Sequence, residues 1–283
     1  MASDPLIGQV LHDTHEIVRR IGVGGMGTVY EAVHMRLRKQ RFAVKVLHAR
    51  MMENEAIYTR FRQEAEVATE IGHPNIVYVT DFYETSEGQP CIVMEYLEGE
   101  DLAQRMKQKK TLVMAQIIQL LEQVGSALQA VHDKGVVHRD LKPGNIFLCK
   151  TRDGSVRAKV LDFGISKIRD SGNSITGDQA VLGTPSYMSP EQGEGRVNDV
   201  DARTDIFALG IICYRMLCDE LPFSGPTMIS VIRAICDKPH KPLTSHRPGL
   251  GAEVESVLDR ALAKDKEQRY SRIEEFTQAF KDA

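Results

Sequence analysis

Apolar and polar residues alternate through the first part of the chain, which is a pattern typical of β-strands. Between residues 14 and about 48 the alternation runs around glycine-rich and basic turns, and it predicts three strands. A helix is predicted over 55–71, because a glycine and then a proline follow it as stop signals. Strand-like runs over 76–83 and 90–96 complete a β-rich N-terminal region that contains one helix.

After residue 99 the apolar residues change to helical spacing. The stretch 113–134 places five of them on one helix face, namely Ile117, Leu121, Val124, Leu128 and Val131. Short β runs return between residues 136 and 161, where an Asp153-Gly154 turn joins one pair. From Thr204 onward the pattern is again helical.

These elements predict an α+β fold with two lobes. We expect an N-lobe over about 14–96, formed by an antiparallel β-sheet and one helix, and a mainly α-helical C-lobe over about 100–280. A hinge is expected at about 95–99, and both lobes form one predicted domain over residues 1–283. Clefts between lobes are common places for small ligands to bind.

Composition indicates a soluble globular protein with a sizeable core. Of the 283 residues, 42% are hydrophobic and 27% are charged. The net charge is −3 and the pI is near 6.3, so no overall field favours nucleic acid or an anionic membrane. Nucleic-acid binding is therefore not expected.

The cysteines and the N-terminal residues indicate in which compartment the protein is expected. The five cysteines lack metal-binding spacing, which favours packing roles in a reducing compartment. The first ten residues do not have the basic and apolar regions of a secretory signal. The longest apolar stretch, 208–218, contains Arg215 and is too short to span a bilayer. We expect a cytoplasmic location and no membrane contact from this segment, with the cytoplasmic domain of a longer membrane-anchored protein as the alternative.

A glycine-rich run, Gly22-Val23-Gly24-Gly25-Met26-Gly27, matches the pattern GxGxxG. In a dinucleotide-binding fold a helix begins after the last glycine, and its N-terminus holds the pyrophosphate. Here the residues after Gly27 have the composition of a strand. A glycine turn between two antiparallel strands places bare backbone N–H groups over phosphates, and the context favours this arrangement. An ordinary hairpin turn remains the alternative.

A lysine and a glutamate are predicted to pair in the N-lobe. Lys45 lies in a strand-like run with Ala43 on the same side, and a half-buried lysine needs an anionic partner. On the predicted helix an apolar stripe is defined by Phe61, Ala68 and Ile71. Glu64 falls on this stripe, whereas Glu66 and Glu70 face solvent. We predict that Glu64 holds Lys45 against the α- and β-phosphates of a nucleotide; a solvated strand lysine is the alternative.

Two downstream motifs carry a family resemblance. Val137-His138-Arg139-Asp140-Leu141-Lys142-Pro143-Gly144-Asn145 matches the protein-kinase catalytic loop HRDLKxxN, and Asp162-Phe163-Gly164 matches DFG. With these motifs the chain resembles the Hanks-type, eukaryotic-like serine/threonine protein kinases over about residues 14–280. The glycine run GxGGMGxVY, Gly183-Thr184 and Ser189-Pro190-Glu191-Gln192 resemble the bacterial branch of that family.

This resemblance implies transfer of the γ-phosphoryl group of ATP to serine or threonine hydroxyl groups of proteins. The transition state of such a transfer is loose, so positioning and charge neutralisation supply most of the catalysis. Asp140 is expected to accept or orient the proton of the attacking hydroxyl, and Lys142 to lie near the γ-phosphate. Asn145 and Asp162 offer the oxygen ligands that Mg²⁺ prefers, and Mn²⁺ is an alternative metal. Lysine at position 142 is typical of serine/threonine rather than tyrosine kinases, and Thr184 fits the same division.

The same resemblance assigns the ATP pocket. Met94 is the expected gatekeeper, and the backbone of residues 95–97 is expected to contact the adenine edge. The full expected set is Ile21, Gly22, Gly24, Gly25, Gly27, Val29, Ala43, Lys45, Met94, Glu95, Leu97 and Phe147. Many family members carry leucine where Phe147 stands.

Three further residues match supporting positions of the family. Asp205 opens a helix that is apolar nearly all round and is therefore buried. In the family this aspartate anchors the backbone of the catalytic loop, and an N-cap role is the alternative. Glu191 and Arg269 match a structural ion pair.

A polar segment between residues 162 and 191 is rich in hydroxyl groups. Arg139 needs an anion once desolvated, and a phosphate on this segment would supply one. The candidate autophosphorylation sites, in order of preference, are Thr176, Ser174 and Ser171. Asp178 stands where bacterial relatives often carry a second phosphorylated threonine, and Thr184 is expected at the substrate-docking site. A segment whose hydroxyl groups stay unmodified is the alternative.

Two other functions retain the same motifs. A pseudokinase scaffold would bind partners without transferring phosphate, and a small-molecule kinase of related fold would use a different acceptor. The segment 183–192 resembles a peptide-docking platform, which favours protein substrates. Bacterial relatives can pair through their N-lobes, so a homodimer through this lobe stays open, although no residue pattern demands it.

Overall fold

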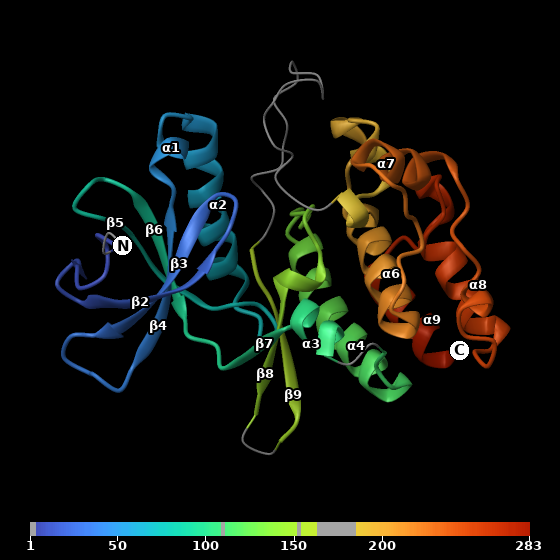
Figure 1. Ribbon diagram of the computed structural model, residues 1–283, viewed down its shortest axis with the longest axis horizontal. Coiled ribbons are helices and arrows are strands. Elements are labelled where there is room, and N and C mark those ends of the chain that lie inside the picture. Colours follow the sequence, from blue (N-terminus) through green and yellow to red (C-terminus); the bar gives the residue numbers. More distant parts are fainter. Residues whose placement is uncertain (1–3, 109–110, 152–153, 163–184) are drawn as a thin grey trace. The chain divides into compact units, whose positions relative to one another are not determined.

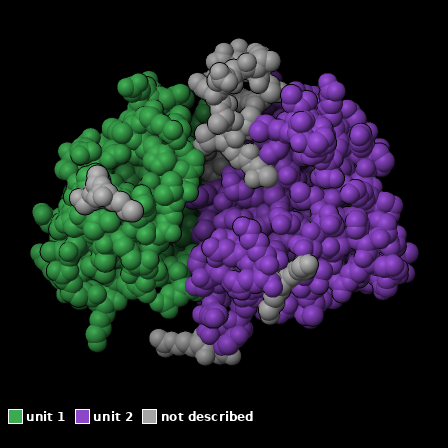
Figure 2. All heavy atoms as spheres, viewed as in Figure 1, with its two compact units in different colours: residues 1–98 green, residues 99–283 purple. Residues whose placement is uncertain are grey.

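The computed structural model describes residues 4–108, 111–151, 154–162 and 185–283 (Figure 1). The chain divides into two compact units, residues 1–98 and 99–283, which are coloured separately in Figure 2.

Unit 1 contains a six-stranded sheet in which every neighbouring pair is antiparallel, in the order β1-β2-β3-β4-β6-β5. The strands are β1 (Val10–Leu11), β2 (His15–Val23), β3 (Gly27–His34), β4 (Arg41–Leu47), β5 (Val79–Glu84) and β6 (Pro90–Glu95). The predicted antiparallel sheet is confirmed. The short strand β1 was not predicted, because two residues carry no measurable alternation.

One face of this sheet forms the apolar core of unit 1. On this face, every second residue of the strands is buried. Leu6 and Leu11, which precede the first predicted strand, are buried against the same face and are 6% and 2% exposed. The sheet contributes Ile17, Tyr30, Ala32, Val44, Val46, Cys91 and Val93. The N-terminal segment therefore covers this face and leaves the opposite face of β4 for other contacts.

The helix α2 (Glu55–Ile71) has the bounds that the sequence predicts. Asn54 caps its N-terminus by accepting a hydrogen bond from the backbone N–H of Ile57 at 3.2 Å. Gly72 ends it in the left-handed conformation with φ 57°, which glycine adopts without steric cost. Figure 1 shows α2 beside the sheet, and its buried residues are Phe61, Glu64, Ala65 and Ala68. A short helix, α1 (Ala49–Met52), precedes it and was not predicted.

Unit 2 combines a small sheet with helices. The strands β7 (Gly99–Asp101), β8 (Ile146–Lys150) and β9 (Val156–Val160) pair antiparallel in this order. The helices are α3 (Leu102–Gln108), α4 (Met114–His132), α5 (Pro190–Gly193), α6 (Ala202–Cys218), α7 (Met228–Asp237), α8 (Ala252–Ala261) and α9 (Ile273–Asp282). The expected mainly helical C-lobe is confirmed. Among the described residues, no helix is both long enough and apolar enough to cross a membrane.

The helix α6 forms the centre of unit 2. Thirteen of its residues are buried, from Thr204 to Leu217, which explains why its sequence is apolar nearly all round. The helix α4 packs against both α6 and α9, and Gly125 permits close approach because a Cβ there would lie 2.6 Å from the side chain of Thr277. This core fixes the start of α6, where the residues that hold the catalytic loop are found.

Candidate active site

The glycine run of unit 1 forms the turn between β2 and β3. The backbone N–H of Gly24 donates to the carbonyl of Gly27 at 2.8 Å, and Gly22 pairs with Val29 across the two strands. A Cβ on Gly27 would lie 2.4 Å from the carbonyl oxygen of Val46, so the turn requires glycine there. Because a strand and not a helix follows Gly27, the dinucleotide-binding alternative is wrong. Ile21, near the end of β2, and Gly24 and Gly25 of the turn are exposed.

Several expected ATP-pocket residues share one face of the unit 1 sheet. Val29 pairs with Lys45, and Ala43 pairs with Met94, in directly opposed positions. Directly opposed residues of antiparallel strands project to the same side, so these side chains lie together on the face opposite the apolar core. Glu95 ends β6 and Leu97 follows it, both half-buried. Phe147, predicted with them, lies in β8 of unit 2.

Lys45 and Glu64 form the predicted pair. The ammonium of Lys45 donates to Glu64 Oε1 at 3.0 Å, and each residue is 8% exposed. Glu66 and Glu70 are exposed, as the helical phase indicates. Because both charges are removed from water, each depends on the other for its stability in the fold.

The catalytic-loop residues of unit 2 converge on one carboxylate. Lys142 Nζ donates to Asp140 Oδ2 at 2.8 Å. The side-chain amide of Asn145 donates to the carbonyl of Asp140 at 3.0 Å and reaches Asp140 Oδ2 at 3.4 Å. The side chains of Asp140 and Lys142 are 18% and 29% exposed, so a carboxylate and an ammonium lie side by side and within reach of solvent.

Asp205 holds the start of this loop. Its two carboxylate oxygens accept the backbone N–H groups of His138 at 2.8 Å and of Arg139 at 2.9 Å. His132 Nε2 lies 2.7 Å from the oxygen that binds His138. The N-cap of α6 is Asp201, which accepts from the N–H of Arg203, so the geometry supports the anchoring role of Asp205 and not the N-cap alternative.

The charge of Asp205 is stabilised although the residue is fully buried. Burial by itself would raise the pKa of Asp205, but the hydrogen bond from His132, the charges of the two histidines and the N–H of His138 outweigh burial and lower it. The carboxylate is therefore ionised at neutral pH and can accept several hydrogen bonds at once.

Two residues of this region adopt the left-handed conformation, which non-glycine residues rarely do. Arg139 has φ 64° and Asp162 has φ 47°. Leu161 links the two regions, because its N–H donates to the carbonyl of Asn145 at 2.8 Å and its carbonyl lies 3.0 Å from His138 Nε2. Hydrogen bonds from the catalytic loop thus hold the strained backbone in place.

The side chains of Asn145 and Asp162 fit the chemistry of Mg²⁺. Both hydrogen bonds of the Asn145 side chain use its NH₂ group, so its oxygen remains available as a ligand. Among the described residues, no group of three or more His, Cys, Asp or Glu side chains could hold a metal by itself. Mg²⁺ commonly takes one or two protein oxygens and completes its coordination with phosphates and water, which this donor set permits.

The Glu191–Arg269 pair is present and fully buried. Arg269 Nη2 lies 2.9 Å from Glu191 Oε2, and the two side chains are 0% and 1% exposed. Burial alone would raise the pKa of Glu191, but the hydrogen bond and charge of Arg269 lower it. Thr204 also donates to Glu191, at 2.7 Å, so α5 is fixed to the start of α6.

Other predicted residues lie outside the described residues. These are Phe163 and Gly164 of the DFG motif, Ser171, Ser174, Thr176, Asp178 and Thr184. A contact that was not predicted is that of Gln192, whose side chain reaches the backbone of Arg139. The sequence signal for it is limited to its place beside Glu191.

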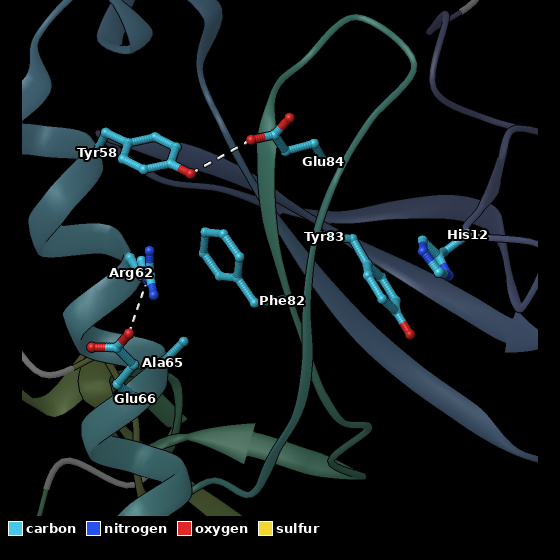
Figure 3. A pocket seen from close by; sticks show the side chains of 8 residues that line it. All are labelled: His12, Tyr58, Arg62, Ala65, Glu66, Phe82, Tyr83 and Glu84. Carbon is cyan, nitrogen blue, oxygen red and sulfur yellow. Dashed lines mark hydrogen bonds and ion pairs between the residues drawn. The ribbon is translucent and has the colours of Figure 1, made fainter.

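A pocket on unit 1 is lined by none of the predicted site residues. It has a volume of about 600 Å³ and is lined by His12, Tyr58, Arg62, Ala65, Glu66, Phe82, Tyr83 and Glu84. Phe82 and Tyr83 are neighbours in β5. Figure 3 shows the ring of Phe82 between this strand and α2, and the ring of Tyr83 stacks on that of His12 with a centroid distance of 4.8 Å. None of these residues belongs to the expected ATP pocket.

Comparisons with known proteins agree on one family. The model of the family described as the protein kinase domain matches residues 15–282. The chain is 41% identical over 282 residues to serine/threonine-protein kinase Pkn1 of Myxococcus xanthus, covering 100% of this chain and 40% of the relative. It is 39% identical over 268 residues to serine/threonine-protein kinase PknB of Mycobacterium tuberculosis, covering 92% of this chain and 41% of that protein. The chain thus spans about two fifths of the length of these relatives.

Solved structures show the same similarity. The kinase domain of PknI from Mycobacterium tuberculosis superposes with a TM-score of 0.75 at 31% identity, covering 98% of both chains. A double mutant of that domain gives a TM-score of 0.76 at 30% identity, covering 100% of this chain and 99% of the other.

Proposed function

The chain belongs to the protein kinase domain family, and on this basis we propose that it transfers the γ-phosphoryl group of ATP to serine or threonine hydroxyl groups of proteins. The observation that carries the proposal is the cluster in which Lys142 and Asn145 both donate hydrogen bonds to Asp140. Its carboxylate is half-buried yet in reach of solvent, as a group that meets a protein hydroxyl must be.

Asp140 acts in this proposal on the attacking hydroxyl. Its carboxylate accepts or orients the hydroxyl proton, and Lys142 places a positive charge beside the reacting phosphate. The hydrogen bond from Asn145 to the carbonyl of Asp140 keeps the loop backbone in place. These residues hold and position charge, which is the main requirement of phosphoryl transfer.

On unit 1, Lys45 and the glycine turn bind the nucleotide phosphates in this proposal. Glu64 holds the ammonium of Lys45 in place, and the turn between β2 and β3 offers backbone N–H groups without side chains. Val29 and Ala43 provide apolar surface for the adenine, on the same sheet face as Lys45.

Asn145 and Asp162 are the residues that would hold Mg²⁺, and Mn²⁺ suits the same oxygen donors. The ion, when bound, supplies charge neutralisation for the phosphates. The left-handed backbone conformation of Asp162 sets the direction in which its carboxylate approaches the ion in this proposal.

A labelled-ATP transfer assay on basic model proteins tests the proposal, with an aminoglycoside as the rival small-molecule acceptor. We expect Asp140→Asn to keep nucleotide binding and to lower turnover by about 10²- to 10⁴-fold. Site mapping of the products identifies the acceptor residues, and mapping of the chain itself tests autophosphorylation at Thr176, Ser174 and Ser171. Transfer at the wild-type rate by Asp140→Asn would refute the role of Asp140, and phosphate found only on the small molecule would refute the substrate class.

We also propose a cytoplasmic location. All five cysteines are free thiols, as expected in a reducing compartment. Burial raises the pKa of Cys91 to about 12, so this thiol stays protonated and unreactive.

A further inference from the structure

Gln192 joins α5 to the catalytic loop through one side-chain amide. Its Nε2 donates to the backbone carbonyl of Arg139 at 2.8 Å, and its Oε1 accepts the backbone N–H of Ser189, the N-cap of α5, at 3.1 Å. The residue is half-buried, and it lies 53 positions from Arg139 in the sequence. Both ends of the amide are therefore used, which fixes its orientation.

The carbonyl that Gln192 binds belongs to the peptide group that leads into Asp140. The N–H of this same peptide donates to the carbonyl of His138 at 2.9 Å. Because a peptide group is planar, holding its C=O and its N–H fixes its orientation, and the Cα of Asp140 lies in that plane. The direction of the Asp140 side chain consequently depends on the contact with Gln192.

This support matters because the loop backbone is strained at the same place. Arg139 is left-handed, with φ 64°, and such a conformation costs a non-glycine residue about 1–2 kcal/mol. Asp205 binds the N–H groups of His138 and Arg139, upstream of the strained φ and ψ pair. The hydrogen bond from Gln192 acts on the downstream side, between Arg139 and Asp140.

Gln192 is itself held in a fixed place. Its neighbour Glu191 is buried against Arg269 and accepts a hydrogen bond from Thr204. Thr204 precedes Asp205 in α6, so two consecutive residues of one helix hold α5 and the catalytic loop. The distance between Gln192 and Arg139 is thereby set by the core of unit 2.

We propose that Gln192 is a positioning residue that orients Asp140 through the carbonyl of Arg139. The inference rests on the proposed kinase function for its catalytic consequence. Gln192 acts through the backbone, so its removal should change turnover more than nucleotide affinity.

The main test is Gln192→Glu in the full chain. The new carboxylate keeps an oxygen that accepts the N–H of Ser189, but it places its other oxygen against the carbonyl of Arg139. We expect kcat at about pH 8 to fall about 10- to 100-fold while KM for Mg·ATP stays within about twofold, because a small misplacement of a catalytic group has effects of this size.

The pH profile separates positioning from a general loss of structure. A protonated glutamic acid can donate to the carbonyl of Arg139, and placement against that carbonyl disfavours the carboxylate and raises the pKa of the new side chain above its ordinary value. The kcat of Gln192→Glu relative to the wild type should therefore rise as the pH is lowered from about 8 to about 5.5. The side chain of Gln192→Met cannot donate a hydrogen bond at any pH. The kcat of this variant relative to the wild type should therefore stay low and should not change with pH. Equal and pH-independent ratios for both variants would overturn the proposal.

Gln123 provides a matched control. In α4 it makes the same double contact with a backbone, donating to the carbonyl of Val156 at 3.1 Å and accepting the N–H of Ala158 at 2.7 Å. Gln123→Glu makes the same chemical change beside β9 and is expected to lower the melting temperature while kcat stays within about twofold of the wild type. A loss of kcat equal to that of Gln192→Glu would contradict the proposal.

Amide hydrogen exchange without nucleotide distinguishes failure of this inference from failure of the proposed function. Exchange in a peptide covering residues 137–146 should be faster in Gln192→Met than in the wild type. If the wild type transfers no phosphate but exchange rises in the variant, the kinase function fails and the positioning contact stands. If the wild type is active, and both Gln192 variants keep its kcat and its exchange rates, the positioning role is refuted.

Discussion

Single carboxylates determine much of the local geometry of unit 2. Asp205 binds two consecutive backbone N–H groups of the catalytic loop and one histidine, while it is fully buried. A buried carboxylate that accepts several hydrogen bonds is stable only as long as it remains ionised and its donors remain in place. Its substitution should therefore affect the loop as well as the core.

We predict that Asp205→Asn lowers the free energy of unfolding by about 2–4 kcal/mol at neutral pH, because the amide leaves buried donors unpaired. The pKa of Asp205 is lowered in the folded protein, so its contribution is complete above the unfolded value of about 4 and is lost as the pH falls through the folded pKa. The difference between variant and wild type should thus shrink as the pH falls below about 4. Urea unfolding followed by circular dichroism measures it; a difference that grows in acid would contradict this account.

At the scale of elements, the short helix α5 depends on a tertiary ion pair. A helix of four residues has too few internal hydrogen bonds to be stable alone. Glu191 and Arg269 are fully buried, and Arg269 also donates to the carbonyls of Ala263, Lys264 and Arg203. The pair therefore joins α5 to α6 and to the segment after α8.

A double-mutant cycle tests how strongly this pair couples the elements. Glu191→Leu and Arg269→Met should each lower the free energy of unfolding by about 3–5 kcal/mol, because each leaves an uncompensated buried charge. The double variant should lose less than the sum of the two, with a coupling of about 2 kcal/mol or more. As a control, the exposed pair Arg62–Glu66 of α2, with side chains 62% and 59% exposed, should couple by less than about 1 kcal/mol. Equal couplings for the two pairs would refute the prediction.

At the scale of the whole molecule, the proposed site residues are divided between the two units. Lys45, Glu64 and the glycine turn lie in residues 1–98, whereas Asp140, Asn145 and Asp162 lie in residues 99–283. Nucleotide and metal binding should therefore be tested on the full chain.

We predict that Mg·ATP at 100 times its Kd stabilises the full chain by about 2.7 kcal/mol, since a ligand that binds the folded state shifts the unfolding equilibrium. For a chain of 283 residues this corresponds to a rise in melting temperature of about 5 °C. Chelation of the metal should remove most of the shift, and Asp162→Ala should lack the metal-dependent part. A shift in Asp162→Ala that still depends on the metal would exclude Asp162 as a ligand.

Much of the fold was predictable because local spacing carries it. The helix over 55–71 has the predicted bounds, and its phase correctly placed Glu64 inside and Glu66 outside. The strand after Gly27 was also predictable, and it decided between two kinds of glycine motif. The segment before residue 14 was not assigned to any element, because its burial depends on contacts with strands that follow it in the sequence.

What the sequence by itself determined is the order of the elements, the side of each element that turns inward, and the family, since periodicity and motifs are properties of neighbouring residues. Only the tertiary structure decided that Asp205 binds the catalytic loop instead of capping α6, and that Gln192 holds the carbonyl of Arg139. These contacts join residues 66 and 53 positions apart and use backbone atoms, which every residue carries. The sequence therefore left two roles open for Asp205 and did not predict the contact of Gln192.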